Sequence, residues 1–197
     1  MPDNAPNQPD YEAMHKQLVL EDEKFKEFVR GHHKFTLERL KEDPRDSLNP
    51  ELVVMTRDMA LKEEVTVLFI GCDFNESKIK QQIMFGAGRM FYEKQQVPVA
   101  VILASEVWTS KCKLESDWQE CQPRHDPMRT EGVLIAGAGL IQEQRMVIVT
   151  PIKRDEANKI LIDGDPDEYD KSKFYLIDHF WRGYFSEVIK KEQGKKE

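Results

Sequence analysis

The sequence predicts an α+β fold in which helices pack on a mostly antiparallel sheet of about six strands. Three observations support this class. Apolar residues recur at helical spacing near both ends of the chain and once in between. Runs rich in β-branched residues fill most of the remainder, and short polar or glycine-bearing segments join them. Because such connections favour antiparallel neighbours, the expected element order is α-ββ-α-ββββ-α.

The first part of the chain is expected to be a tail followed by a helical segment. Residues 1–9 contain three prolines and no apolar periodicity, so we expect a disordered tail there. Residues 10–192 are predicted to form a single domain, and residues 193–197 a charged C-terminal tail. From residue 10, apolar side chains such as Phe25, Val29 and Leu40 recur near a 3.6-residue period. This predicts one long helix that breaks near Gly31, or two successive helices.

The middle and the end of the chain supply the sheet and two further helices. Residues 51–58 and 63–71 predict a β-hairpin. A helix is expected to follow, beginning with a capping box at Asp73 and Glu76 and running to about Gln95. Residues 97–108 are apolar on both alternating faces, which predicts a central strand. Three more strands are expected in residues 131–137, 144–155 and 158–164, and a last helix in residues 174–191.

Composition narrows the function classes. The chain has 197 residues and a net charge of -7, which argues against a general nucleic-acid binder. Its longest apolar stretches fall short of the roughly 18 residues that span a bilayer, and its start lacks the features of a signal peptide. Three cysteines fit reduced thiols better than a disulfide framework. We therefore expect a soluble, cytoplasmic protein without membrane contact.

The known nucleotide and calcium fingerprints are not matched. Gly86 and Gly88 lie inside a helical pattern, where they are expected to allow close helix packing. Gly137 and Gly139 follow a strand without the third glycine of a dinucleotide-binding loop, so a turn is expected there. The acidic segment from Asp163 to Asp170 does not match an EF-hand loop, because the positions that need glycine and glutamate hold Glu168 and Phe174. An acidic turn before the last helix is expected instead.

The ends of two predicted strands hold the main candidate site. Side chains alternate along a strand, so Glu106 and Trp108 share a face with buried small residues, and Arg129 and Glu131 share a face in the following strand. If the two strands are antiparallel neighbours, all four residues cluster at one end of the sheet. A carboxylate there needs a partner, and Arg129 or Lys111 could supply it.

Two interpretations of this cluster stay open. One is a buried ion pair that fixes the root of the long polar segment, with Trp108 as packing. The other is a functional cleft with Glu106, Arg129 and Glu131 as candidate catalytic residues and Trp108 as a candidate binding residue. Connections of more than 12 to 15 residues without structure are often functional, which keeps the second interpretation open beside the first.

Metal ligation by the cysteines is considered and not expected. Cys112, Cys121 and His125 have the spacing C-x8-C-x3-H, whereas structural zinc sites use shorter knuckles and four ligands. His32 and His33 are adjacent on a helix and therefore point about 100° apart, so they are poorly placed to share an ion. One is expected to pack near the apolar stripe and the other to face water. No cofactor is expected.

The same region carries a resemblance. A strand that ends in Ser105-Glu106-Val107-Trp108 is followed by Asp126-Pro127 and then by Arg129-Thr130-Glu131 leading into the next strand. Over residues 50–153 the sequence resembles an uncharacterised set of bacterial and phage-type proteins of unknown function. The resemblance implies the architecture and no activity. The polar loop here is longer than in that set and carries Cys112 and Cys121.

Two functions follow as hypotheses. The first is a non-enzymatic accessory or protein-interaction module, with a protein partner or a second copy docking on the N-terminal helical segment. The alternative for that segment is packing on the chain's own sheet. The second function is a hydrolase or nuclease-like enzyme in which Glu106 and Glu131 act as acid and base or bind a divalent metal. An open pocket with both carboxylates within bridging distance of one ion favours the enzyme, whereas a satisfied ion pair favours the structural role.

Overall fold

A computed structural model describes residues 19–44, 47–57, 65–71, 77–110, 128–172 and 174–193 and confirms the α+β class. The helices are α2 (Asp22–Glu42), α3 (Ser77–Glu93) and α4 (Tyr175–Gln193). The strands are β1 (Glu51–Arg57), β2 (Val65–Gly71), β3 (Val97–Thr109), β4 (Thr130–Gly139), β5 (Arg145–Arg154), β6 (Ile160–Ile162) and β7 (Asp167–Asp170). The predicted tail of residues 1–9, most of that of residues 193–197 and the capping box at Asp73 and Glu76 lie outside the described residues.

The strands form one antiparallel sheet in the order β2-β1-β3-β4-β5-β6. The predicted hairpin pairs β1 with β2, and β3 lies between β1 and β4 as its two apolar faces predict. A seventh strand, β7, pairs with the first half of β5, and β6 pairs with the second half. All four residues of β7 are exposed, and its sequence DEYD has no alternation of apolar and polar residues from which a strand could be predicted.

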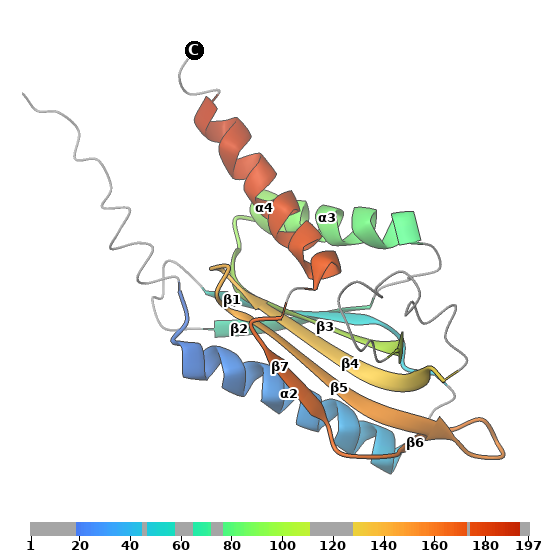
Figure 1. Ribbon diagram of the computed structural model, residues 1–197. Helices are drawn as coiled ribbons and strands as arrows, with labels where there is room; N and C mark the ends of the chain where they lie inside the picture. Colours follow the sequence, from blue (N-terminus) through green and yellow to red (C-terminus); the bar gives the residue numbers. More distant parts are fainter. Residues whose placement is uncertain are drawn as a thin grey trace, which may run out of the picture.

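The helices cover both faces of the sheet, with α2 on one face and α3 and α4 on the other (Figure 1). Each face has its own apolar core. Beneath α2, Phe25, Val29 and Leu40 pack with strand residues such as Ile102 and Ile135. Beneath α3 and α4 lies a second cluster whose members include the following residues: Leu52, Met84, Phe91, Val101, Ile177, Phe180 and Trp181. The central strand β3 contributes to both clusters because alternate side chains point to opposite faces.

The predicted break near Gly31 does not occur, because α2 continues through it as a single helix. The expectation for the two histidines is also wrong, since both His32 and His33 are buried. His32 Nε2 lies 3.3 Å from the Glu51 carboxylate of β1, and His33 Nε2 lies 2.7 Å from Thr150 Oγ1 of β5. A helix lying flat on a sheet can bury two adjacent polar residues when each finds a partner on a strand beneath it.

Close packing joins α3 to α4 through glycines. A Cβ added to Gly88 of α3 would lie 2.0 Å from the Phe180 carbonyl oxygen of α4, and one added to Gly183 would lie 2.0 Å from that of Phe85. The expectation of close helix packing is therefore confirmed at Gly88. It does not hold at Gly86, where an added Cβ would meet nothing within 4 Å.

The turn expected at Gly137 and Gly139 is not found there. Gly137 and Gly139 belong to β4 rather than to a turn, which instead occupies residues 140–144. A Cβ on Gly137 would lie 2.4 Å from a Val29 methyl group, so glycine here allows α2 to approach the sheet closely. Within the described part of the chain, no helix is both long enough and apolar enough to cross a membrane.

Candidate functional site

The predicted charge cluster lies at one end of the sheet, on the face that α2 covers. In the register of β3 and β4, Glu106 is opposite Val133, and Trp108 is opposite Glu131. The same register places Ala104 opposite Ile135, and both belong to the core beneath α2. Because opposite residues in an antiparallel pair point to the same face, Glu106, Trp108 and Glu131 continue this face beyond the apolar core.

Arg154 at the end of β5 binds both carboxylates. Its Nε donates to Glu131 Oε2 at 3.1 Å and its Nη2 to Glu131 Oε1 at 2.5 Å, which makes a two-point contact. The same Nη2 donates to Glu106 Oε2 at 2.9 Å. Hydrogen bonding to Glu131 raises the pKa of Arg154, so its charge is fixed. One guanidinium therefore holds the two predicted catalytic carboxylates together.

Glu106 also receives a backbone partner from the segment between α2 and β1. The Leu48 N–H donates to Glu106 Oε1, and the Leu48 side chain is buried in the core beneath α2. The carboxylate thus links β3, β5 and the connection after α2. This is the arrangement expected of a polar group that is buried only where its hydrogen bonds are met.

Arg129, which was expected in this cluster, lies against Trp108. Its guanidinium carbon lies 4.5 Å from the centre of the Trp108 ring, a cation–π geometry. Trp108 is 49% exposed, and Met128, which precedes Arg129 in the sequence, is 83% exposed. The end of the sheet therefore combines an inner layer, in which Arg154 pairs with two carboxylates, with an outer surface of aromatic, cationic and thioether side chains.

Arg154 is the residue of this site that sequence reasoning missed. The sequence did hold one signal. Arg154 lies two residues after Ile152 and six after Ile148, so the alternation of side chains along β5 places it on the same face as these two residues, which lie in the core beneath α2. A cation at the end of such a row faces the same side as Glu131, but only the register of β4 on β5, with Glu131 opposite Ile152, brings the two within contact.

A second polar cluster joins α2 to β1. Glu51 is contacted by His32 at 3.3 Å and by Arg39 at 3.6 Å. The hydrogen bond with His32, assisted by the charge of Arg39, lowers the pKa of Glu51. Burial lowers the pKa of His33 below its ordinary value of 6.5. These contacts fasten the helix to the sheet.

The described residues contain no group of three or more histidine, cysteine, aspartate or glutamate side chains that could hold a metal ion. The zinc candidates Cys112, Cys121 and His125 lie outside the described residues. At Glu106 and Glu131, the positive charge of Arg154 occupies the position between the carboxylates that a bridging cation would need.

No family model, no curated protein and no solved structure matches this chain. The resemblance to the bacterial and phage-type set therefore stays a prediction.

Proposed function

We propose that the chain is a cytoplasmic, non-enzymatic accessory protein that binds a protein partner at the end of the sheet where Trp108 lies. One observation carries the proposal: both carboxylates that could serve catalysis are bound by Arg154, while Trp108 stays half exposed beside them. The inner charges stabilise the end of the sheet, and the exposed part of Trp108 is available for contact.

The outer surface has the composition of a protein-binding hot spot. Tryptophan and arginine are the residue types that contribute most to binding free energy at interfaces, and methionine is enriched there. Trp108 is held on β3, and the Arg129 guanidinium lies over its ring. A side chain held in this way loses little conformational entropy on binding, which favours affinity.

The N-terminal helix offers less for a partner. Phe25, Val29 and Leu40 of α2 are at most 2% exposed because they pack on the chain's own sheet, whereas Phe35 of the same helix is 47% exposed. Docking through this helix would need another face of it. We therefore place the partner surface at Trp108 and Arg129 instead.

Affinity enrichment from cells of the source organism tests this function. We expect wild-type protein to retain a partner that the Trp108→Ala variant loses. Tyr169→Ala is the matched control, because Tyr169 on β7 is 50% exposed, nearly the same as Trp108. The control should retain the partner. Equal recovery by wild type and Trp108→Ala would refute a partner surface at this position.

The alternative function, a hydrolase or nuclease-like enzyme, makes an opposite prediction. Two carboxylates that bind a catalytic divalent ion should give saturable heats when Mn²⁺ or Mg²⁺ is titrated into the protein, and Glu106→Gln with Glu131→Gln should abolish them. We expect no saturable heat that depends on these two residues, because a cation would have to displace the Arg154 guanidinium.

A further inference from the structure

A pocket of about 620 Å³ lies between α4 and the turn that joins β4 to β5. It opens beside Trp181, which belongs to the core beneath α3 and α4. Trp108 lies on the opposite face and at the other end of β4, whose ten residues span about 30 Å. The volume falls within the roughly 300–1,000 Å³ typical of small-molecule sites. The pocket is therefore independent of the proposed protein-binding surface.

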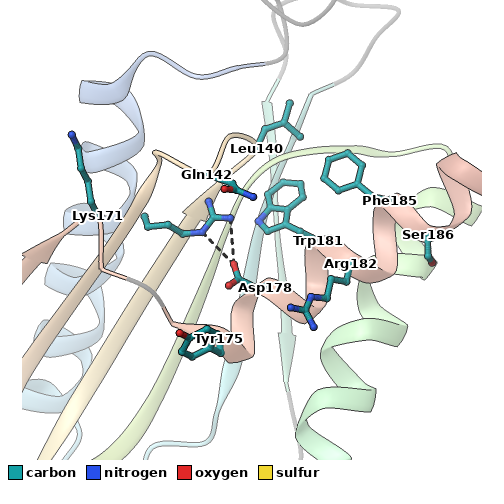
Figure 2. A pocket seen from close by; sticks show the side chains of 10 residues that line it. Leu140, Gln142, Lys171, Tyr175, Asp178, Trp181, Arg182, Phe185 and Ser186 are labelled. Carbon is teal, nitrogen blue, oxygen red and sulfur yellow. Dashed lines mark hydrogen bonds and ion pairs between the residues drawn. The ribbon is translucent and has the colours of Figure 1, made fainter. Parts of the chain in front are cut away.

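The pocket has an apolar end and a polar end (Figure 2). Leu140, Trp181 and Phe185 lie toward one end, and Tyr175, Asp178 and Arg182 lie toward the other. The rings of Trp181 and Phe185 are stacked, with centroids 5.9 Å apart. Such a division fits a ligand that has an apolar body and one polar group.

Positive charge exceeds negative charge around the pocket. Arg145, Lys171 and Arg182 line it together with a single carboxylate, that of Asp178. Asp178 is already held by Arg145, whose Nε and Nη2 each lie 3.3 Å from Asp178 Oδ1. Arg182 forms no ion pair with any carboxylate of the described residues. On a chain of net charge -7, this local excess favours an anionic ligand.

Trp181 supplies a hydrogen-bond donor that lacks an acceptor. Its side chain is only 5% exposed, and its Nε1 has no partner among the described residues. Figure 2 shows the ring nitrogen turned toward the side of the pocket where Gln142 and Asp178 lie. A buried N–H without an acceptor costs free energy, and a ligand oxygen would remove that cost. Because Gln142 is exposed, its side chain can move to admit one.

We propose that this pocket binds a small organic carboxylate with an aromatic or apolar body. The carboxylate accepts one hydrogen bond from Trp181 Nε1. Arg182 follows Trp181 on α4, but its side chain is long and exposed, so its guanidinium can turn toward the same carboxylate and pair with it. The body lies against Phe185 and Leu140. Planar, charge-assisted contacts of this kind suit an arginine better than a lysine. The uncharged analogue of the same ligand would leave Arg182 without its partner and should bind more weakly.

Nuclear magnetic resonance of the full chain tests the proposal with phenylacetate as the probe. The chain has three tryptophans, and the indole N–H signal of Trp181 is assigned by its loss in Trp181→Phe. We expect phenylacetate to move that signal downfield in a saturable manner. Phenylacetamide, which has the same shape without the charge, should bind about tenfold more weakly, as should phenylacetate to Arg182→Gln.

Two controls make the result decisive. Arg30→Gln removes an equal charge from α2 on the other face of the sheet, where Arg30 pairs with Glu168 in an exposed position, and should leave phenylacetate binding unchanged. Inorganic phosphate should not compete at equal concentration. The proposal is overturned by the absence of a saturable shift, by equal binding of phenylacetamide, by equal competition from phosphate, or by equal losses in Arg30→Gln and Arg182→Gln.

Discussion

Replacing Arg154 by methionine should leave Glu106 and Glu131 without their shared cation. The three side chains are 21%, 22% and 14% exposed for Arg154, Glu106 and Glu131 respectively, so they lie nearer to buried than to surface ion pairs. Removing one partner of a fully buried pair costs about 3–5 kcal/mol, and an exposed pair contributes about 0–1 kcal/mol. We expect the free energy of unfolding to fall by about 2–3 kcal/mol.

Urea denaturation followed by circular dichroism at neutral pH measures this loss. The m value, which is the slope of the unfolding free energy against urea concentration, should stay unchanged. Lys153→Met is the matched control on the neighbouring residue. Lys153 pairs with Asp163 at 2.7 Å, but the side chains are 60% and 45% exposed, so its loss should stay below about 1 kcal/mol.

A triple variant separates charge from packing. Combining Arg154→Met with Glu106→Gln and Glu131→Gln removes the uncompensated charges, and we expect it to recover about 1 kcal/mol or more of the loss. The reasoning would be refuted if Arg154→Met destabilised the protein no more than Lys153→Met, or if the triple variant were less stable than Arg154→Met alone.

Two further predictions concern the helices. Gly88→Ala should lower the free energy of unfolding by more than about 2 kcal/mol because its Cβ would collide with the Phe180 carbonyl, whereas Gly86→Ala in the same helix should raise it by about 0.5–1 kcal/mol. Thermal melts of the two variants check this, and equal melting temperatures would contradict it. His33, whose folded-state pKa lies below 6.5, should stabilise the fold fully above that pH and lose this contribution as the pH falls through its folded-state pKa. A proton NMR titration of His33 that gave a pKa above 6.5 would contradict this.

The sequence predicted the class, the central strand and the neighbours of the candidate site because these follow from local periodicity. The two apolar faces of β3 placed it inside the sheet, and strand alternation put Glu106, Trp108 and Glu131 on one face. The antiparallel pairing of β3 with β4, on which the cluster depended, is confirmed.

The rest depended on contacts between distant segments. Arg154 meets Glu131 only through the register of β4 on β5, and a shift of one residue would turn it to the other face. The burial of both His32 and His33 depended on Glu51 and Thr150, which lie on two different strands. Neither sequence spacing nor residue type specifies such pairings, because the partners are far apart along the chain.

The central claim is that Glu106 and Glu131 stabilise the end of the sheet while Trp108 binds the partner. The most direct test is to measure, below the melting temperature of the variant, whether Glu106→Gln/Glu131→Gln still recovers the protein partner. If these carboxylates only stabilise the end of the sheet, the variant should unfold more easily and yet retain the partner that Trp108→Ala loses. A folded variant that loses the partner, or loses a metal-dependent activity of the wild type, would show that the carboxylates themselves carry the function.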